Sequence, residues 1–273
     1  MATLTDTPPE VERLWVEIWR QMSPERKWLK LAETFQTAKL LHAAGFRQRH
    51  PGASAADIHA DWLAVQYGFH AAATMEEPAM EPVAQNVEIL REVLGALTKL
   101  GIPYALGGSM ASSIHGIARY TQDADVTVEP FSGKEAQLVA LFGSDYYVSL
   151  PAVRQAVRDR SSFNILQTRA GFKIDVFVRK DTPFEEAALA RRVQFSLPEQ
   201  AGPPIDLLTA EDVILFKLHW YRLGNESSSQ QWVDVLGVLK VQAGRLDEAH
   251  LDRFAAELGV GDLLARARKE AAG

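Results

Sequence analysis

Residues 104–128 read YALGGSMASSIHGIARYTQDADVTV and carry the strongest structural pattern in the chain. The first three residues are apolar, which is typical of a short buried strand. Gly107 and Gly108 allow a sharp turn with positive φ, and a helix is expected to begin near Ser109. A spacer of thirteen residues then leads to a second strand, which begins at Asp123. The stretch therefore predicts strand, glycine turn, helix and strand.

Two carboxylates share one face of this second strand. Side chains two residues apart in an extended segment point to the same side, so Asp123 and Asp125 lie together and Val126 faces a core. Neighbouring carboxylates repel each other unless a cation lies between them. Magnesium is the expected ion because it prefers oxygen ligands and takes its remaining ligands from water and substrate phosphates. The exposed amides where the helix begins at Ser109 would favour a phosphate.

A third carboxylate is expected to join this pair from another strand. In the segment 172–178, FKIDVFV, Asp175 projects from the face opposite to Ile174. Two-metal phosphoryl chemistry needs such a further ligand. The alternative is an ion pair between Asp175 and either Lys173 or Arg179 on its own strand face, since an acidic residue among apolar neighbours needs a partner.

The order Gly-Gly-Ser, spacer, Asp-x-Asp and later strand aspartate resembles the signature of the nucleotidyltransferase superfamily typified by DNA polymerase beta. The resemblance covers roughly residues 84–240. The runs RYTQDAD at 119–125 and EDVILFK at 211–217 look most similar to bacterial stand-alone nucleotidyltransferases, which include abortive-infection and toxin–antitoxin enzymes. Members of the superfamily transfer a nucleoside monophosphate from a nucleoside triphosphate to a hydroxyl and release pyrophosphate.

The resemblance implies a role for each matching residue. Asp123 and Asp125 would bind two magnesium ions, and Asp175 would hold the catalytic ion and help to activate the acceptor hydroxyl. The expected nucleotide-binding residues are Gly107, Gly108, Ser109, Arg119 and Lys217. The nucleoside triphosphate is then one substrate, and the acceptor is RNA, a protein partner or a small molecule. The alternative is a non-catalytic nucleotide-binding or antitoxin-like interaction protein, whose N-terminal helices dock a partner.

Three of the candidate residues have two interpretations each. Arg119 either neutralises charge on the pyrophosphate or pairs with an acidic strand residue. Lys217 either contacts the triphosphate or extends along an amphipathic helix to water. By the same resemblance, Asp234 either supports the site, toward metal or lysine, or lies on a solvated helix face.

Composition limits the remaining classes of function. The chain has 273 residues, of which 47% are hydrophobic and 23% charged, which is ordinary for a globular protein. It has no cysteine, which excludes disulfides and thiolate chemistry. We expect a cytoplasmic protein, because the sequence contains neither a membrane-spanning run nor a signal-peptide pattern. The net charge of −6 argues against broad, non-specific binding to nucleic acid.

The expected fold class is α+β, with a nucleotidyltransferase-type mixed sheet flanked by helices, an N-terminal helical bundle and C-terminal helices. The domains expected are a helical N-terminal module (1–80), a nucleotidyltransferase core (81–205) and a C-terminal helical region (206–273), with a proline-containing linker at 69–83. Within them we predict a helix that follows Ser23 and ends at Gly45, a capping box of Ser54 and Asp57, and a helix that begins at Ser132 with Glu135 completing its capping box.

Overall fold

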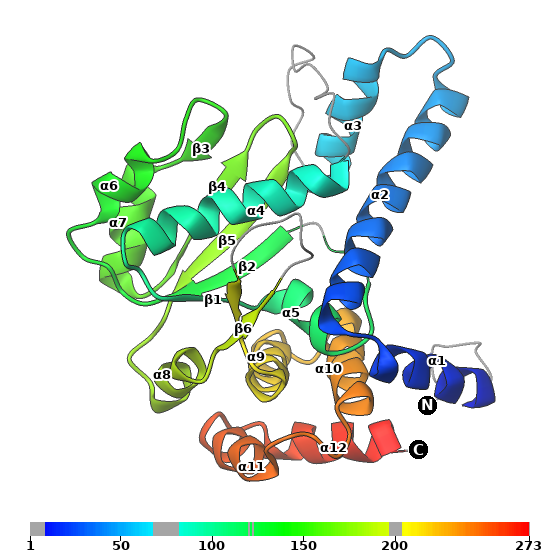
Figure 1. Ribbon diagram of the computed structural model, residues 1–273, viewed down its shortest axis with the longest axis vertical. Coiled ribbons are helices and arrows are strands. Elements are labelled where there is room, and N and C mark those ends of the chain that lie inside the picture. Colours follow the sequence, from blue (N-terminus) through cyan, green and yellow to red (C-terminus); the bar gives the residue numbers. More distant parts are fainter. Residues whose placement is uncertain (1–8, 68–81, 120, 122, 197–203, 273) are drawn as a thin grey trace.

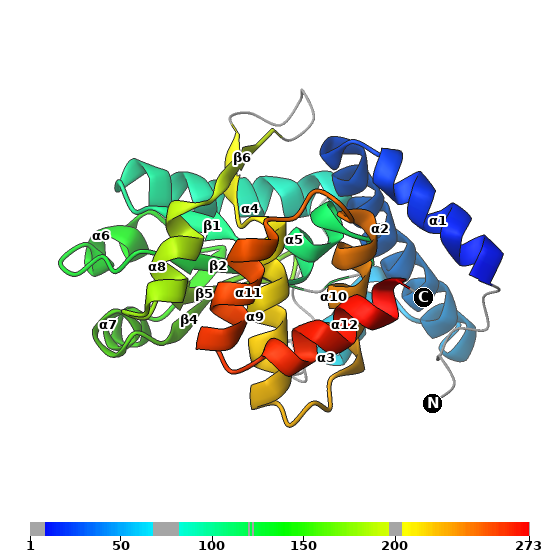
Figure 2. The same cartoon turned by 90° about the horizontal axis from the view of Figure 1, so that it is seen from below.

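A seven-stranded mixed sheet forms the centre of the protein, and helices surround it (Figure 1). The computed structural model describes residues 9–67, 82–119, 121, 123–196 and 204–272. The N-terminal helices extend along one side of the sheet, and the C-terminal helices gather at its lower edge (Figures 1 and 2). The expected α+β class, with a mixed sheet flanked by helices, is confirmed.

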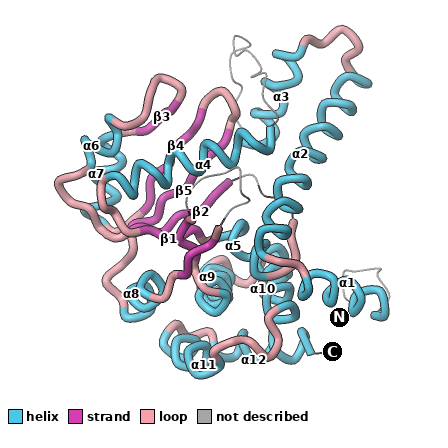
Figure 3. Tube along the Cα trace, in the orientation of Figure 1, coloured by secondary structure: helices cyan, strands magenta, loops and turns pink. Residues whose placement is uncertain are grey.

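The elements alternate along the chain as helices and short strands (Figure 3). The helices are α1 (Pro9–Gln21), α2 (Pro24–Arg49), α3 (Ala55–Tyr67), α4 (Pro82–Lys99), α5 (Gly108–His115), α6 (Glu135–Ala140), α7 (Leu150–Asp159), α8 (Pro183–Ala190), α9 (Ala210–Leu223), α10 (Ser229–Val241), α11 (Glu248–Glu257) and α12 (Gly261–Ala272). The strands are β1 (Tyr104–Leu106), β2 (Asp123–Val128), β3 (Tyr146–Val148), β4 (Ser162–Gln167), β5 (Phe172–Val178), β6 (Val193–Phe195) and β7 (Ile205–Leu207).

The strand order is β3-β4-β5-β2-β1-β7-β6, which places β2 near the middle of the sheet. β2 is parallel to β5 and antiparallel to β1. The predicted strand, glycine turn, helix and strand at 104–128 are present as β1, α5 and β2. β6 and β7 were not predicted from the sequence. β7 nevertheless adds a parallel partner to β1, with Leu207 opposite Leu106.

The two faces of the sheet differ in chemistry. Ile174 and Val176 of β5 and Phe163 of β4 share a face and are buried. α4 packs on β5, and α7 packs on β4 and β5. On the other face, Asp125 of β2 and Asp175 of β5 lie opposite one another. The alternation thus separates an apolar core from a polar surface, as the pattern of both strands predicts.

Three short-range predictions about the helices have different outcomes. The capping box at α3 is confirmed, since Ser54 donates to the carboxylate of Asp57 and its Oγ accepts from the Asp57 amide. The end of the second helix at Gly45 is wrong, because α2 continues to Arg49. A single glycine inside a helix costs about 1 kcal/mol, which is too little to end a helix that packs along α3.

The predicted helix start at Ser132 is also wrong. α6 begins at Glu135 after an N-cap at Lys134 that has no side-chain hydrogen bond. Gly133 has a φ of +86°, so the chain is still turning there. The carboxylate of Glu135 accepts from the Gly133 amide, which is a contact of the turn and not of a capping box.

Both α1 and α2 pack against the rest of the chain. Val16 and Trp19 of α1 pack with Val241 at the end of α10. α2 packs on α5, where the Lys27 ammonium lies 3.5 Å from the carbonyl oxygen of His115. The expected linker at 69–83 lies outside the described residues as far as position 81. Its last two residues, 82 and 83, belong to α4. None of the described helices combines the length and apolar character that a membrane span requires.

Candidate active site

The glycine turn brings the start of α5 against a carboxylate of β2. The Gly107 amide donates to the backbone carbonyl of Asp125 at 2.8 Å. Gly108 has a φ of +55°, and a β-carbon there would lie 1.7 Å from Asp125 Oδ2. The Ser109 amide donates to Asp125 as well. Only glycine leaves room for this approach, so residue 108 must lack a side chain for the carboxylate to lie under the helix start.

The three predicted carboxylates lie close enough to influence one another. Asp125 and Asp175 are register partners on the parallel strands β2 and β5, and Asp123 lies two residues before Asp125 on the same face. Burial raises the pKa of Asp125, and the charges of Asp123 and Asp175 raise it further, to about 7. Lys217 and the Ser109 amide act in the opposite direction, but they do not restore the ordinary value of 3.8. The structure thus gathers an excess of negative charge around one partly buried carboxylate.

Lys173 lies between two of these carboxylates. Its Nζ is 2.7 Å from Asp175 Oδ2 and 3.7 Å from Asp123 Oδ2. Burial lowers the pKa of Lys173, but the hydrogen bond and charge of Asp175, together with Asp123 and Asp125, raise it overall. The Asn164 amide of β4 donates to Asp175 Oδ1. The ion pair between Asp175 and Lys173, which was the alternative interpretation, is therefore present.

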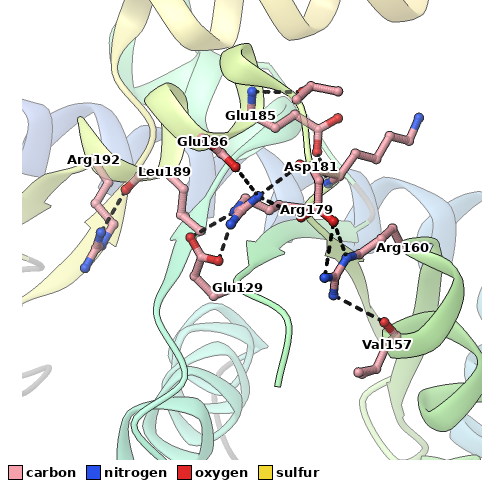
Figure 4. A network of polar contacts seen from close by, with 11 residues as sticks. Glu129, Val157, Arg160, Arg179, Asp181, Glu185, Glu186, Leu189 and Arg192 are labelled. Atoms are coloured by element: carbon pink, nitrogen blue, oxygen red, sulfur yellow. Dashed lines mark hydrogen bonds and ion pairs between the residues drawn. The ribbon is translucent and has the colours of Figure 1, made fainter. Parts of the chain in front are cut away.

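Arg179, the other partner considered for Asp175, belongs to a separate network. Its Nε donates to both carboxylate oxygens of Glu129 at 2.9 Å, and its Nη1 contacts Asp181 and Glu186 at 3.3 and 3.4 Å (Figure 4). Arg179 follows the last residue of β5, so this network joins the opposite end of the strand to α8. This network does not include the three carboxylates of the site.

Asp234 of α10 joins the two predicted cationic residues of the site. Arg119 donates to its Oδ1 through Nε at 2.6 Å and to its Oδ2 through Nη2 at 2.8 Å. Lys217 of α9 donates to the same Oδ2 at 2.7 Å. Burial raises the pKa of Asp234, but these two cations outweigh that effect and lower it overall. Asp234 is buried, so its position on a solvated helix face is excluded.

The Asp234 network reaches back to the glycine turn. Arg119 Nη2 donates to the hydroxyl of Ser109 at 2.7 Å, and Lys217 also contacts the side-chain oxygen of Gln231 at 3.1 Å. Lys217 is buried, which excludes the interpretation in which it extends to water. Tyr120 and Gln122, which belong to the motif beside Arg119, lie outside the described residues. The Arg119 guanidinium therefore contacts the start of α5 through Ser109, and the Lys217 ammonium contacts the same Asp234 carboxylate as Arg119 does.

Sequence reasoning did not predict two of the neighbours. Asn164 was not considered, although it alternates with Phe163 and Ile165 as the polar position of a strand and could have been noticed for that reason. Gln231 gives no comparable indication, because polar residues are common in the first turn of a helix. Its contact with Lys217 depends on how α9 and α10 pack.

The side chains suit a hard cation, although their arrangement is incomplete. Carboxylate oxygens are the ligands that magnesium prefers, and the high pKa of Asp125 shows that a further positive charge would be favourable there. Asp123 and Asp125 could hold such an ion. Across the described residues, however, no three acidic or histidine side chains stand in the geometry of an ion site. The Lys173 ammonium contacts two of the carboxylates instead.

Comparisons with known proteins find matches among solved structures. No family model matches the chain, and no curated protein does. Among solved structures, ANT(2'')-Ia in complex with adenylyl-2''-tobramycin matches with 16% identity and a TM-score of 0.42, over 63% of this chain and 98% of that one. A nucleotidyltransferase-like antigenic protein from Paracoccidioides brasiliensis matches with 16% identity and a TM-score of 0.42, over 68% and 93%. At TM-scores below 0.5, function has to be argued from the geometry of the site.

Proposed function

We propose that the chain is a magnesium-dependent nucleotidyltransferase that moves a nucleoside monophosphate from a nucleoside triphosphate to a hydroxyl and releases pyrophosphate. The observation that carries this proposal is the contact between the glycine turn and Asp125. A helix start that can bind phosphate lies directly against a partly buried carboxylate whose raised pKa favours a nearby cation. Substrate phosphates and a magnesium ion satisfy both requirements at once.

The phosphate-binding part comprises the turn and the two cations beside it. The amides at the start of α5 would donate to a phosphate, and the Ser109 amide would be shared with Asp125. Arg119 and Lys217 would attract the β- and γ-phosphates, and Asp234 fixes both side chains. Asp234 would thus act as a positioning residue, because its carboxylate contacts both cations.

The carboxylates would serve the reacting atoms. Asp123 and Asp125 would hold magnesium, which when bound neutralises charge on the phosphates. Asp175 would accept the proton of the acceptor hydroxyl as its oxygen attacks the α-phosphorus. The bond between the α-phosphorus and the bridging oxygen then breaks, and its electrons leave with pyrophosphate. Asn164 orients Asp175 through its hydrogen bond to Oδ1.

The acceptor is the less defined part of the proposal. RNA, a protein side chain and a small hydroxylated molecule all provide the required hydroxyl. The negative net charge argues mildly against RNA. The toxin-type subgroup and a cytoplasmic location stay predictions that rest on the sequence.

A labelling experiment tests the function and identifies the acceptor class. Each nucleoside triphosphate, labelled at its α-phosphate, is incubated with the protein, magnesium and a cell extract that is then separated into protein, RNA and small molecules. We expect one fraction to be labelled by the wild type and not by Asp123→Asn or Asp125→Asn. Asp252→Asn, at an exposed position of α11, should label as the wild type does. Magnesium-dependent nucleotide binding without any labelling would instead favour the non-catalytic, antitoxin-like alternative.

A further inference from the structure

The side chain of Lys173 lies between two carboxylates of the site. Its Nζ contacts Asp175 at 2.7 Å and lies 3.7 Å from Asp123. On the proposed function, on which this inference rests, two magnesium ions would be expected there. We propose that the ammonium of Lys173 replaces the ion on the acceptor side, so that the protein binds a single divalent cation together with its nucleotide.

The hydrogen bonds of Asp175 support this assignment. Lys173 contacts Oδ2, and the Asn164 amide donates to Oδ1. Both oxygens of the third carboxylate therefore already have a donor within the protein. A divalent ion could use Asp175 as a ligand only through the remaining lone pair of one of these oxygens, and at Oδ2 it would lie beside the positively charged ammonium of Lys173.

The strand register fixes Lys173 in this position. Lys173 lies opposite Asp123, and Asp175 lies opposite Asp125, so four charged residues form a square on two paired strands. Side chains on one face of β5 recur every second residue, which keeps Lys173 beside Asp175. The lysine is about one-third exposed, at 31%, so it is held in a polar environment and not in the apolar core.

Charge balance also favours a single ion. The three carboxylates carry three negative charges when ionised, and Lys173 contributes one positive charge. Before a nucleotide binds, the remaining two negative charges are matched by one divalent cation, so the protein's own groups do not require a second ion. Arg119 and Lys217 share the separate carboxylate of Asp234 and do not change this local balance.

The experiment counts bound ions directly. The protein is equilibrated with Mn²⁺ and a nucleotide whose α,β-bridge is a methylene group, so that no transfer occurs, and the metal that remains with the protein is measured by mass spectrometry after dialysis. We expect about one Mn²⁺ per chain for the wild type and about two for Lys173→Met, which removes the ammonium but keeps a chain of similar length. Lys99→Met, at an exposed lysine where α4 ends, serves as the matched control and should bind as the wild type does.

Further variants separate the possible outcomes. Lys173→Arg keeps the positive charge and should also bind about one ion. Two ions in the wild type, or one ion in a folded Lys173→Met protein, would overturn the inference. If Lys173→Met does not fold, as judged by circular dichroism, Lys173→Gln replaces it and the wild-type count still decides. If the wild type binds no Mn²⁺ in the presence of the nucleotide, the proposed function itself is refuted. If the wild type binds two Mn²⁺ and Asp125→Asn abolishes this binding, only the role of Lys173 is refuted.

Discussion

Gly108 lies so close to Asp125 that a β-carbon on residue 108 would be 1.7 Å from the Oδ2 atom of that carboxylate. The backbone at Gly108 also has a φ of +55°. The contact links the two halves of the site, since one residue begins the phosphate-binding helix and the other is a proposed metal ligand. Any side chain at position 108 must move the carboxylate or the helix start.

Gly108→Ala should therefore abolish nucleotide transfer, with a loss of about 100-fold or more, because a displacement of about 1 Å in a reacting group is sufficient for this. Gly101→Ala is the matched control. Gly101 has a similar φ of +60°, but nothing lies within 4 Å of the position of its β-carbon. Both variants carry a similar backbone strain of about 1 kcal/mol, so a transfer rate that is lost in Gly108→Ala and kept in Gly101→Ala would identify the contact with Asp125 as the cause. Equal rates would contradict it.

The titration of Asp125 predicts how stability changes with pH. Its pKa is about 7 in the folded protein, against an ordinary value of 3.8, because it is buried beside Asp123 and Asp175. The folded state therefore binds a proton more tightly than the unfolded chain does, and stability without metal should fall as the pH rises from about 4 to about 7.

Asp125→Asn should remove this loss of stability at higher pH. At pH 8 in EDTA we expect the variant to be more stable than the wild type by roughly 1–3 kcal/mol, although it is inactive. Near pH 4 the difference should disappear, because Asp125 is then protonated in the folded wild type. Thermal unfolding at the two pH values checks both statements. A variant that is less stable than the wild type at pH 8 would contradict the raised pKa.

Asp234 should matter more for stability than any exposed carboxylate. Asp234→Ala leaves the buried ammonium of Lys217 and the partly buried guanidinium of Arg119 without their shared counter-charge, which costs about 3–5 kcal/mol. Because the pKa of Asp234 is lowered, its contribution is complete above the ordinary aspartate pKa and is lost only in acid. Urea unfolding between pH 5 and pH 8 should therefore show a constant difference. Asp252→Ala, whose ion pair with Arg268 is exposed, should cost less than about 1 kcal/mol.

Two tryptophans of α1 provide a test of how the N-terminal helices are held. Trp19 is 7% exposed and packs against Val241, whereas Trp15 on the same helix is 53% exposed. Trp19→Ala should destabilise the attachment of α1 by about 3 kcal/mol, and Trp15→Ala should have little effect. Hydrogen exchange of the α1 amides measures this directly. Equal exchange in the two variants would show that the contact with α10 does not hold the helix.

The sequence contained enough information for the parts of the site that are close together along the chain. Period-two alternation identified β2 and β5, and the glycine pair identified the turn before α5. The short strands β6 and β7 gave no such pattern, because three residues are too few to show alternation. The pairing of β7 with β1 is a tertiary contact that a local pattern does not reveal.

Contacts between residues that are far apart in the sequence account for the other features that the sequence did not predict. Arg119 and Asp234 are 115 positions apart, and both had a second interpretation that the sequence could not exclude. Their contact depends on the packing of α10 against α5, where a β-carbon on Gly116 would lie 2.8 Å from the amide nitrogen of Val238. Lys173 was recognised as a partner for Asp175, but its distance to Asp123 follows from the strand register.

The order of the site residues along the chain also matters during synthesis. The glycine turn, Arg119 and all three carboxylates precede Lys217 and Asp234 in the sequence. A nascent chain that has been made only as far as β5 therefore lacks the carboxylate that orients Arg119 and the lysine whose charge acts on Asp125. The complete set of charged side chains should therefore come together late in translation, after α10 has left the ribosome.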